Sequence, residues 1–495
     1  MNMRSSLLAA SLLSFISATA LAQDETDALR YSFLVPQGTA RSMGFGSALG
    51  SVGGDFSSLS VNPAGIGVYR RSEFMFTPSL KFNNTQGRYL NGVDDDSRTA
   101  FNFSNVGLIL TRSEKGKRYE KSNWKAVSFG IGINRLADFN RTYSYSGQMK
   151  GPNASSFSEI FAVDANQYPG DVTTNGTLAY LGYQSYLLDT SGGSYYTLAN
   201  WNTGLNQLRS VTEKGGISEI VFSLGGNYQE KLMIGATLGL PSVRYSRDAF
   251  FEETDASGDA NNGFESFRYS ESLSTTGLGV NLKLGLIYKP SDFFRVGAAI
   301  HTPTWYSLQD EFNESLTANT EVPYGVNTAT NDPLRFEYNL TTPWRGILSA
   351  TAMMGQYGFI TADYEYVDYG SVRYRFSNEF KEEQNLRNDI LKSMFQAASN
   401  FRIGIEGRMQ NLFVRGGFGY YGNPYKDSNN DMKQMTGSLG IGFRTERFFT
   451  DLAYVHAWYD NNETPYTLPY SNVVTPTAQL ENKLNTIALT IGWKM

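Results

Sequence analysis

Hydrophobic and polar positions alternate along most of this chain, from Glu73 to the C-terminus. Within residues 124–134 the apolar positions share one parity: Val127, Phe129, Ile131 and Ile133. The positions between them carry small or polar residues, and the stretches 217–228 and 278–288 repeat the arrangement. A period of two with one apolar face predicts β-strands in a sheet that is wet on one side only.

Continued along the chain, this alternation predicts about fourteen strands, each near or beyond the ~10 residues that cross a membrane at a tilt. We expect them at 73–83, 99–111, 123–146, 217–228, 232–250, 267–288, 294–306, 334–353, 357–376, 401–409, 412–422, 434–444, 448–459 and 483–495.

The connections between these strands alternate in length. The short ones are 229–231, 289–292, 355–356, 410–411 and 445–447, with a modest one at 112–122. The long ones are 84–98, 147–216, 251–266, 307–333, 377–400, 423–433 and 460–482. Outer-membrane barrels have short periplasmic turns and long extracellular loops. The fold class expected is therefore all-β, a transmembrane antiparallel β-barrel of about 14 strands.

The last strand is strongly amphipathic. One face holds Ile487, Leu489, Ile491, Trp493 and Met495. A terminal strand of this kind predicts recognition by the barrel-assembly machinery and closure of the sheet, which leaves no backbone edge unpaired in lipid. Beyond the extreme N-terminus, the sequence has no run of about 18 apolar residues, so it offers no transmembrane helix.

The first 22 residues predict a secretory signal peptide, with Arg4 before an apolar core and Ala20-Leu21-Ala22 as the cleavage site. The expected location is the outer membrane of a Gram-negative bacterium, with its lipid and lipopolysaccharide as surroundings. The chain contains no Cys, which excludes disulfides and a lipid-anchored Cys. Net charge is −5 without a basic stripe, so nucleic acid is not an expected partner.

Residues 31–70 do not alternate and are rich in glycine. They contain Gly38-Thr39-Ala40-Arg41, a Gly/Ala run that ends at Asp55, and Asn62-Pro63-Ala64 just before the first strand. In this position, ahead of fourteen strands, the sequence resembles the FadL/TodX family of long-chain fatty-acid and hydrocarbon transporters. The resemblance implies a hatch at 23–72 that plugs a barrel at 73–495. Its implied hatch residues are Gly38, Arg41, Gly44, Gly46, Asp55, Asn62, Pro63 and Ala64.

The family also implies that apolar ligands enter from extracellular loops and leave sideways through a gap made by a kink in the third strand, without an energy source. Asn134, Arg135 and Asp138 are the candidate counterpart here. The parity of Arg135 would aim a charge at lipid, unless a bulge turns it away. The alternative is that Arg135 lies above the membrane.

Charges on the inward parity have both signs and are expected to pair across the lumen. The candidate lumen polar contacts are Lys283, Arg295, Arg345, Glu406, Arg408 and Arg415. Arg offers fork geometry to a carboxylate-headed ligand, so one or two of them could bind such a ligand. The longest loop, 147–216, carries many aromatic residues; it is either a landing surface for ligand or a self-packed cover.

We therefore expect passive uptake of small hydrophobic compounds, either fatty-acid-like or aromatic, by a monomer without cofactor or metal. The alternatives are a porin-like channel for polar solutes and a surface protein for adhesion or haem binding. The sequence has only two His, and neither sits in a recognisable nucleophile motif, so an enzyme is not expected. The ligand itself stays open.

Overall fold

The computed structural model describes residues 25–259, 261–321, 323–428, 430–470, 473 and 475–495. The predicted signal peptide, residues 1–22, lies outside the described residues. In the described part of the chain, no helix combines the length and the apolar character needed to span a membrane.

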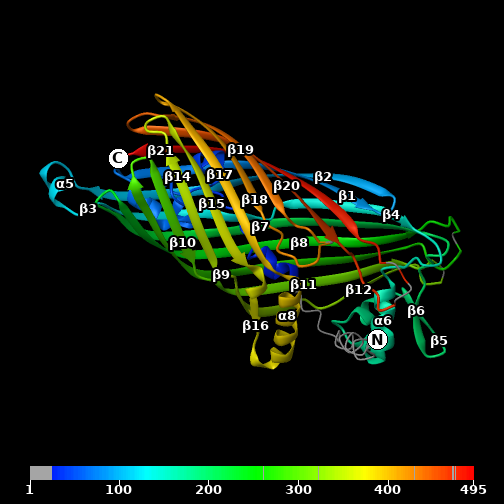
Figure 1. Cartoon of the computed structure of the whole chain (residues 1–495). Coiled ribbons are helices and arrows are strands. Elements are labelled where there is room, and N and C mark those ends of the chain that lie inside the picture. Colours follow the sequence, from blue (N-terminus) through cyan, green and yellow to red (C-terminus); the bar gives the residue numbers. More distant parts are fainter. Residues whose placement is uncertain (1–24, 260, 322, 429, 471–472, 474) are drawn as a thin grey trace, which may run out of the picture.

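Fourteen antiparallel strand positions form one closed ring (Figure 1). The first strand closes on the last through pairs that begin at Glu73 and Lys494. The strands are β1 (Glu73–Tyr89), β2 (Gly92–Ser113), β3 (Trp124–Asp138), β4 (Arg141–Met149), β7 (Leu205–Tyr228), β8 (Leu232–Asp255), β9 (Ser266–Ser291), β10 (Phe294–His301), β11 (Trp305–Asn319), β13 (Leu334–Thr341), β14 (Arg345–Met353), β15 (Gly358–Asp368), β16 (Arg373–Arg375), β17 (Ala397–Met409), β18 (Leu412–Tyr421), β19 (Gln434–Arg444), β20 (Phe448–Glu463) and β21 (Ala478–Lys494). Four positions hold two strands end to end: β3 with β4, β10 with β11, β13 with β14, and β15 with β16. The fourteen-strand barrel predicted from the sequence is confirmed.

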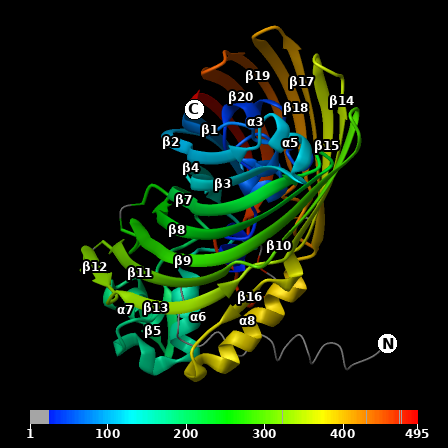
Figure 2. The same ribbon diagram turned by 90° about the vertical axis from the view of Figure 1, so that its left-hand side faces the viewer.

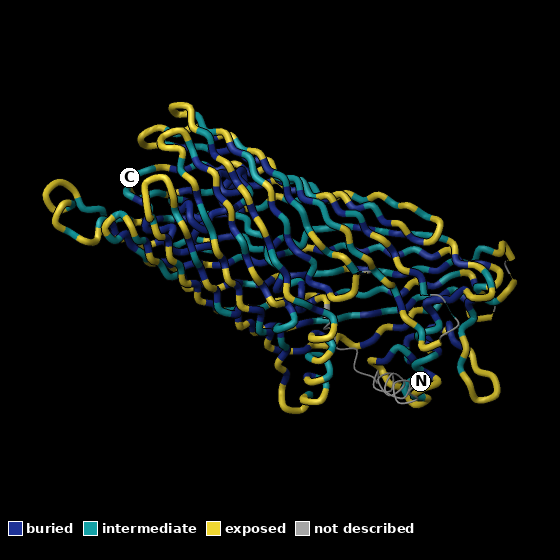
Figure 3. The backbone as a smooth tube through the Cα atoms, in the orientation of Figure 1, coloured by how far each residue is buried: buried dark blue, intermediate teal, exposed yellow. Residues whose placement is uncertain are grey.

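Residues of an exposed, largely apolar outer face alternate with residues of a buried inner face. Figure 3 shows the difference in burial as alternating colours along many of the strands. In β9 the outward residues are Leu278, Val280, Leu282, Leu284, Leu286 and Tyr288. An apolar row of this size around a barrel is stable in lipid and not in water. Toward the long-loop end the same face of β9 becomes polar, with Thr276, Ser274, Ser272 and Ser270. We call the apolar part of the outer wall the belt; the strands continue beyond it.

This continuation corrects several predicted boundaries. Residues 84–98 are not a loop, because β1 and β2 pair as far as Tyr89 and Gly92, and Asp94-Asp95-Asp96 lies within β2. The long connection after the third strand position spans 150–204 and not 147–216, because β4 reaches Met149 and β7 begins at Leu205. Beyond the belt the outer face is polar, so the period of two carries no hydrophobic contrast there.

The remaining elements lie in connections: α5 (Lys117–Lys121), β12 (Val326–Thr330), η3 (Tyr369–Ser371), η4 (Asn378–Phe380) and α8 (Lys381–Met394). The longest connection contains α6 (Glu159–Gln167), η2 (Pro169–Thr173), α7 (Leu178–Gln184), β5 (Leu188–Ser191) and β6 (Ser194–Thr197). Most of its apolar side chains pack on one another and on the barrel wall. Phe157, for example, stacks on Phe251 with ring centroids 4.7 Å apart. Self-packing therefore accounts for most of this connection, while Tyr183, Tyr186 and Tyr196 remain exposed.

A buried carboxyl group joins this connection to the wall. Glu253 lies in β8 beyond the belt, because the outer face of β8 is apolar only as far as Leu240. It accepts hydrogen bonds from the Ser156 hydroxyl, from the Phe157 N–H at 2.8 Å and from Gln207 Nε2 at 2.7 Å. Burial raises the pKa of Glu253 from 4.5 to about 7.

We predict that residues 150–204 dock less firmly as pH rises. The folded state binds a proton at Glu253 more tightly than the unfolded state, so its stabilisation is complete below pH 4.5 and is lost as pH rises to about 7. Hydrogen exchange of α6 and α7 should therefore accelerate between pH 5 and pH 8. Glu253→Gln keeps the shape of the side chain without its charge. In this variant, hydrogen exchange should change with pH only as the intrinsic exchange rate does. The idea fails if both proteins respond to pH equally.

Candidate functional site

The N-terminal segment, residues 25–72, runs inside the ring of strands. Its helices are α2 (Glu25–Arg30), α3 (Ala40–Gly44), α4 (Ser58–Val61) and η1 (Pro63–Val68). Viewed from the short-turn end, α3 lies within the barrel (Figure 2). The large apolar side chains of the N-terminal segment are fully buried: Phe45, Phe56, Leu59 and Ile66. Strands on opposite sides of the ring contact this segment, because α3 packs against β19 and β20 while η1 packs against β7 and β8.

The inner wall is shaped to this segment by glycines. A Cβ at Gly285 would lie 1.9 Å from Asn62 Oδ1, and one at Gly417 would lie 2.1 Å from Gly46 N. Further inward glycines in the same relation are Gly107, Gly235, Gly297 and Gly404. Any side chain at these positions would overlap the segment. Sequence reasoning recognised a face of small residues but missed this role, since alternation alone does not say what the small face contacts.

Thr39 and Asp55 fold the first part of the segment on itself. Thr39 Oγ1 accepts from the Ser42 N–H and so caps α3, and it donates to Asp55 at 2.8 Å. Asp55 also accepts from the Ser57 N–H at 2.9 Å. Gly38 has a φ of +150°, and a Cβ there would lie 2.1 Å from Ser57 Oγ, so only glycine fits.

The Asn62-Pro63-Ala64 motif attaches the last part of the segment to the barrel wall at β9. Asn62 Oδ1 accepts from the Ala64 N–H at 3.1 Å, and Pro63 occupies the first turn of η1. The Asn62 amide donates to Leu286 O at 3.1 Å, which is in β9. The motif therefore combines a helix cap with a contact to the barrel.

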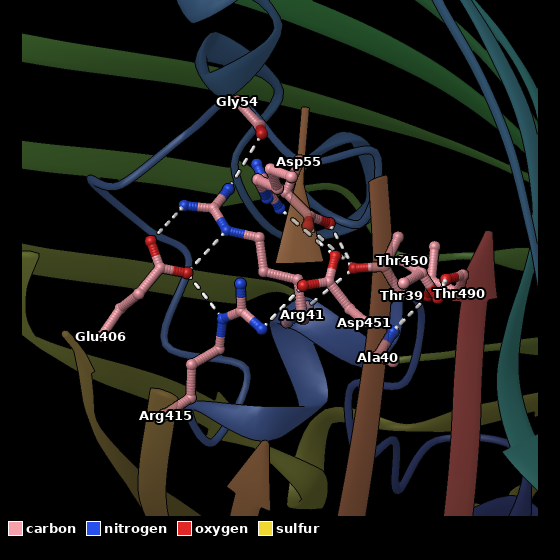
Figure 4. A network of polar contacts seen from close by, with 12 residues as sticks. Thr39, Ala40, Arg41, Gly54, Asp55, Glu406, Arg415, Thr450, Asp451 and Thr490 are labelled. Carbon is pink, nitrogen blue, oxygen red and sulfur yellow. Dashed lines mark hydrogen bonds and ion pairs between the residues drawn. The ribbon is translucent and has the colours of Figure 1, made fainter. Parts of the chain in front are cut away.

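An ion-pair cluster joins α3 to the wall (Figure 4). The Arg41 guanidinium donates to both oxygens of Glu406, at 2.9 and 3.1 Å, and to Gly54 O at 2.9 Å. Arg415 approaches the same carboxylate at 2.6 Å and Asp451 at 2.7 Å, and Arg444 completes the cluster 3.3 Å from Asp451. Every carboxylate has a guanidinium partner, which is the condition for burying charge.

The other predicted lumen residues divide into three groups. Lys283 pairs with Glu219 at 2.5 Å, and Arg345 pairs with Glu365 at 2.8 Å and donates to Ser32 O in the N-terminal segment. Arg295 donates to Val52 O at 2.8 Å. Arg408 is different: it lies within the last two residues of β17, where it is exposed at the short-turn end of the barrel and donates to Gln410 O.

The two histidines make separate contacts. His301 is buried, and its Nε2 lies 2.8 Å from Val61 O in the N-terminal segment. His456 is on the outward face of β20, where its Nδ1 lies 2.8 Å from Asn485 Oδ1. They therefore do not form a shared site.

A cavity of about 60 Å³ lies between the N-terminal segment and the wall. Its lining mixes apolar groups, including Leu34, Pro36 and Ile347, with the Lys283–Glu219 and Arg345–Glu365 pairs. A liquid-water molecule occupies about 30 Å³, so this space is smaller than a typical ligand pocket. A larger ligand could enter only if the segment moved.

The third strand position is irregular next to this cavity. The register between β3 and β7 shifts between Arg135 and Ala137, and the strand breaks between Asp138 and Arg141. Backbone pairing between β2 and β3 stops at Asn105 and Asn134. Across the fully described span 92–149, β4 pairs only with β7, and residues 92–104 of β2 pair only with β1.

Side chains bridge this break in the ladder. Asn102 donates to Asp138 at 2.8 Å, and Ser144 donates to Asp96 at 2.6 Å. Arg135 does not face lipid: its guanidinium donates to Gly215 O at 2.6 Å and lies 3.3 Å from Asp138. Asn134 points inward and donates to Ser60 in the N-terminal segment at 2.8 Å. The wall between β2 and β4 is thus held by side chains in place of backbone hydrogen bonds.

Three solved structures match this chain over nearly the whole length of both chains. A Pseudomonas aeruginosa FadL homologue matches with a TM-score of 0.55 at 11% identity, over 93% of this chain and 99% of that one. The P. putida toluene transporter TodX matches at 0.53 and 12%, over 93% and 99%. A deltaS2 mutant of TodX, a monoaromatic hydrocarbon channel, matches at 0.51 and 13%, over 94% and 100%.

The chain matches no family model and no curated protein. At identities this low, the structural matches establish the fold. The resemblance to FadL and TodX that the sequence predicted is confirmed at that level.

Proposed function

We propose that this chain is a member of the FadL/TodX family and takes up small hydrophobic molecules across the outer membrane by passive diffusion. In this proposal residues 23–72 act as a hatch, whose described part is the N-terminal segment. The ligand enters from the long-loop side, displaces part of the hatch and leaves sideways between β2 and β4. The barrel works as a monomer, surrounded by lipid and lipopolysaccharide.

One observation carries the proposal: the N-terminal segment fills the lumen at the level where the wall between β2 and β4 lacks backbone pairing. A plugged lumen opposes flow of water and ions from end to end. The backbone ladder between β2 and its neighbour stops at Asn105, next to Phe101 and Phe103, which are 60% and 55% exposed on the outer face. Because these side chains belong to the apolar belt, the break offers a route into lipid. An apolar molecule gains about 25 cal/mol per Å² of surface removed from water along this route.

The chemistry of the gap supports a gate that opens without an energy source. Asp138 is shared between Arg135 at 3.3 Å and Lys81 at 3.7 Å, and it also accepts from Asn102. Such side-chain contacts can separate and reform without breaking a β-ladder. Each is worth roughly 1 kcal/mol net, or up to about 3 kcal/mol where a charge takes part.

The test compares ion flow with apolar uptake. In planar bilayers the purified protein should show little steady conductance. Cells that express it should take up the fluorescent apolar probe 1-N-phenylnaphthylamine faster than cells without it, provided that their lipopolysaccharide layer is intact. Steady conductance together with unchanged probe uptake would reject the proposal and favour a porin-like channel.

A further inference from the structure

A groove of about 610 Å³ lies on the outer wall of the barrel at the short-turn end, where β2, β3 and β7 are neighbours. Its apolar side is a row of paired residues that face outward: Leu110 in β2, Phe129 in β3 and Leu224 in β7. All three are exposed residues of the belt, so the groove continues the surface that meets lipid chains. We call this space the outer groove.

The next outward row toward the short turns is no longer wholly apolar. It holds Arg112, Val127 and Gly226, about 7 Å further along the strands. Because Gly226 has no side chain, the indole of Trp124 lies on it, and a Cβ there would be 2.9 Å from the ring. The outer groove thus passes within one row from an apolar surface to an arginine beside an indole, the residue types found at a membrane interface.

Arg112 has N–H groups to offer to a ligand. Its side chain is 83% exposed, and its one polar contact with the described residues is a loose ion pair, 3.9 Å from Glu114. An exposed pair of this kind contributes little and can give way to a stronger acceptor. A phosphate is such an acceptor, because it takes a guanidinium in bidentate geometry.

The connection beside the outer groove adds positive charge. Residues 114–123 include α5 and project beyond the neighbouring strands (Figure 1). We call them the basic connection. Their cations are Lys115, Lys117, Arg118 and Lys121, all exposed and without a carboxylate partner in the described part of the chain. Together with Arg112, five cations stand against Glu114 and Glu120, an excess of three, although the whole chain has a net charge of −5.

The basic connection is fastened to the barrel. The Tyr119 hydroxyl donates to Glu230 Oε1 at 2.9 Å, and Asn123 O accepts from the Gln229 N–H at 2.8 Å. Both partners lie in the next short turn, between β7 and β8. Ser122 of the same connection lines the outer groove. The positive charges are therefore held next to the groove.

We propose that the outer groove binds one anionic glycerophospholipid from the leaflet at the short-turn end. An acyl chain lies on Leu110, Phe129 and Leu224, the phosphate meets Arg112, and the basic connection attracts the net negative headgroup. Lipid headgroups lie at the edge of the belt, so the groove matches such a lipid in both charge and height. The site is on the lipid-facing wall and requires only that the barrel spans a membrane, whatever passes through its lumen.

Native mass spectrometry of the detergent-solubilised barrel counts the lipids that stay bound. The probes are dioleoyl phosphatidylglycerol and dioleoyl phosphatidylethanolamine, with glycerol 3-phosphate as a competitor that has the phosphate but no acyl chain. The test variants are R112Q and K115Q/K117Q. The control is Arg447→Gln, which removes an exposed cation from the short turn 445–447, outside the groove. Heat-dependent migration in gels verifies that each barrel is folded.

We expect one phosphatidylglycerol to bind, about tenfold more weakly in R112Q because a charge-assisted hydrogen bond is lost, and unchanged in the control. K115Q/K117Q should lose the preference for phosphatidylglycerol over phosphatidylethanolamine.

A folded R112Q that binds phosphatidylglycerol as the original chain does would overturn the proposal. So would an equal loss in R112Q and the control, which would indicate charge without a site, or equal binding of both phospholipids by the original chain. Displacement of the lipid by glycerol 3-phosphate would also overturn it, in favour of a site for free phosphate. None of these results depends on probe uptake, so this proposal and the proposed uptake can fail separately.

Discussion

Replacing Arg41 with alanine is expected to convert a non-conducting barrel into one that conducts ions. Arg41 makes a buried charged contact between the proposed hatch and the wall, because its guanidinium donates to both oxygens of Glu406 and also to Gly54 O. Removing one partner of a buried pair is destabilising by about 3–5 kcal/mol. Because Arg415 still neutralises Glu406, we expect a value near the lower end, about 3 kcal/mol. That corresponds to a roughly 100-fold larger open population, since each 1.4 kcal/mol is a factor of ten.

The measurement is single-channel conductance in planar bilayers, together with hydrogen exchange of residues 38–67. In Arg41→Ala both openings and exchange should increase. Arg335→Ala, which breaks a pair between exposed side chains, should leave both unchanged, because surface pairs contribute at most about 1 kcal/mol. If Arg41→Ala stays as closed and as protected as the original chain, the ion pair does not hold the hatch.

The strands within the belt could be predicted from the sequence because lipid and lumen impose opposite polarity on neighbouring residues. In β9, Leu282 and Leu284 face out while Asn281 and Lys283 face in, and this contrast is visible without a structure. Beyond the belt the contrast disappears. In β2, Asp94, Asp95 and Asp96 are polar on both faces, so the sequence predicts this strand only from residue 99, although β2 begins at Gly92.

The hatch contacts could be predicted only in part. Glycine content and the Asn62-Pro63-Ala64 motif indicated a compact segment before the first strand. Its partners could not be deduced, because Arg41 and Glu406 are 365 residues apart and no local pattern links them. Parity predicts Glu406, Arg408 and Arg415 on the inner face. Glu406 and Arg415 are buried, whereas Arg408 is exposed at the short-turn end of β17, because parity does not tell how close a residue lies to the mouth of the barrel.

A disulfide across the gap between β2 and β4 is expected to stop uptake while leaving the barrel intact. The sequence contains no Cys, so D96C/S144C introduces the only thiols. The two side chains are in direct contact, with 2.6 Å between Ser144 Oγ and Asp96 Oδ2, which brings a pair of thiols within reach. Once oxidised, this link fixes β4 against β2. We expect 1-N-phenylnaphthylamine uptake to fall at least tenfold and to return after reduction.

The matched control joins two strands whose ladder is already complete. Ser246 and Ser274 are paired residues of β8 and β9 on the outer face beyond the belt, so S246C/S274C places a disulfide where nothing has to move. Oxidation of this control should not change uptake. If oxidised D96C/S144C transports as well as its reduced form, the ligand does not leave between β2 and β4. The route would then have to run past the hatch toward the short-turn end. In that case Arg41→Ala would increase probe uptake as well as conductance.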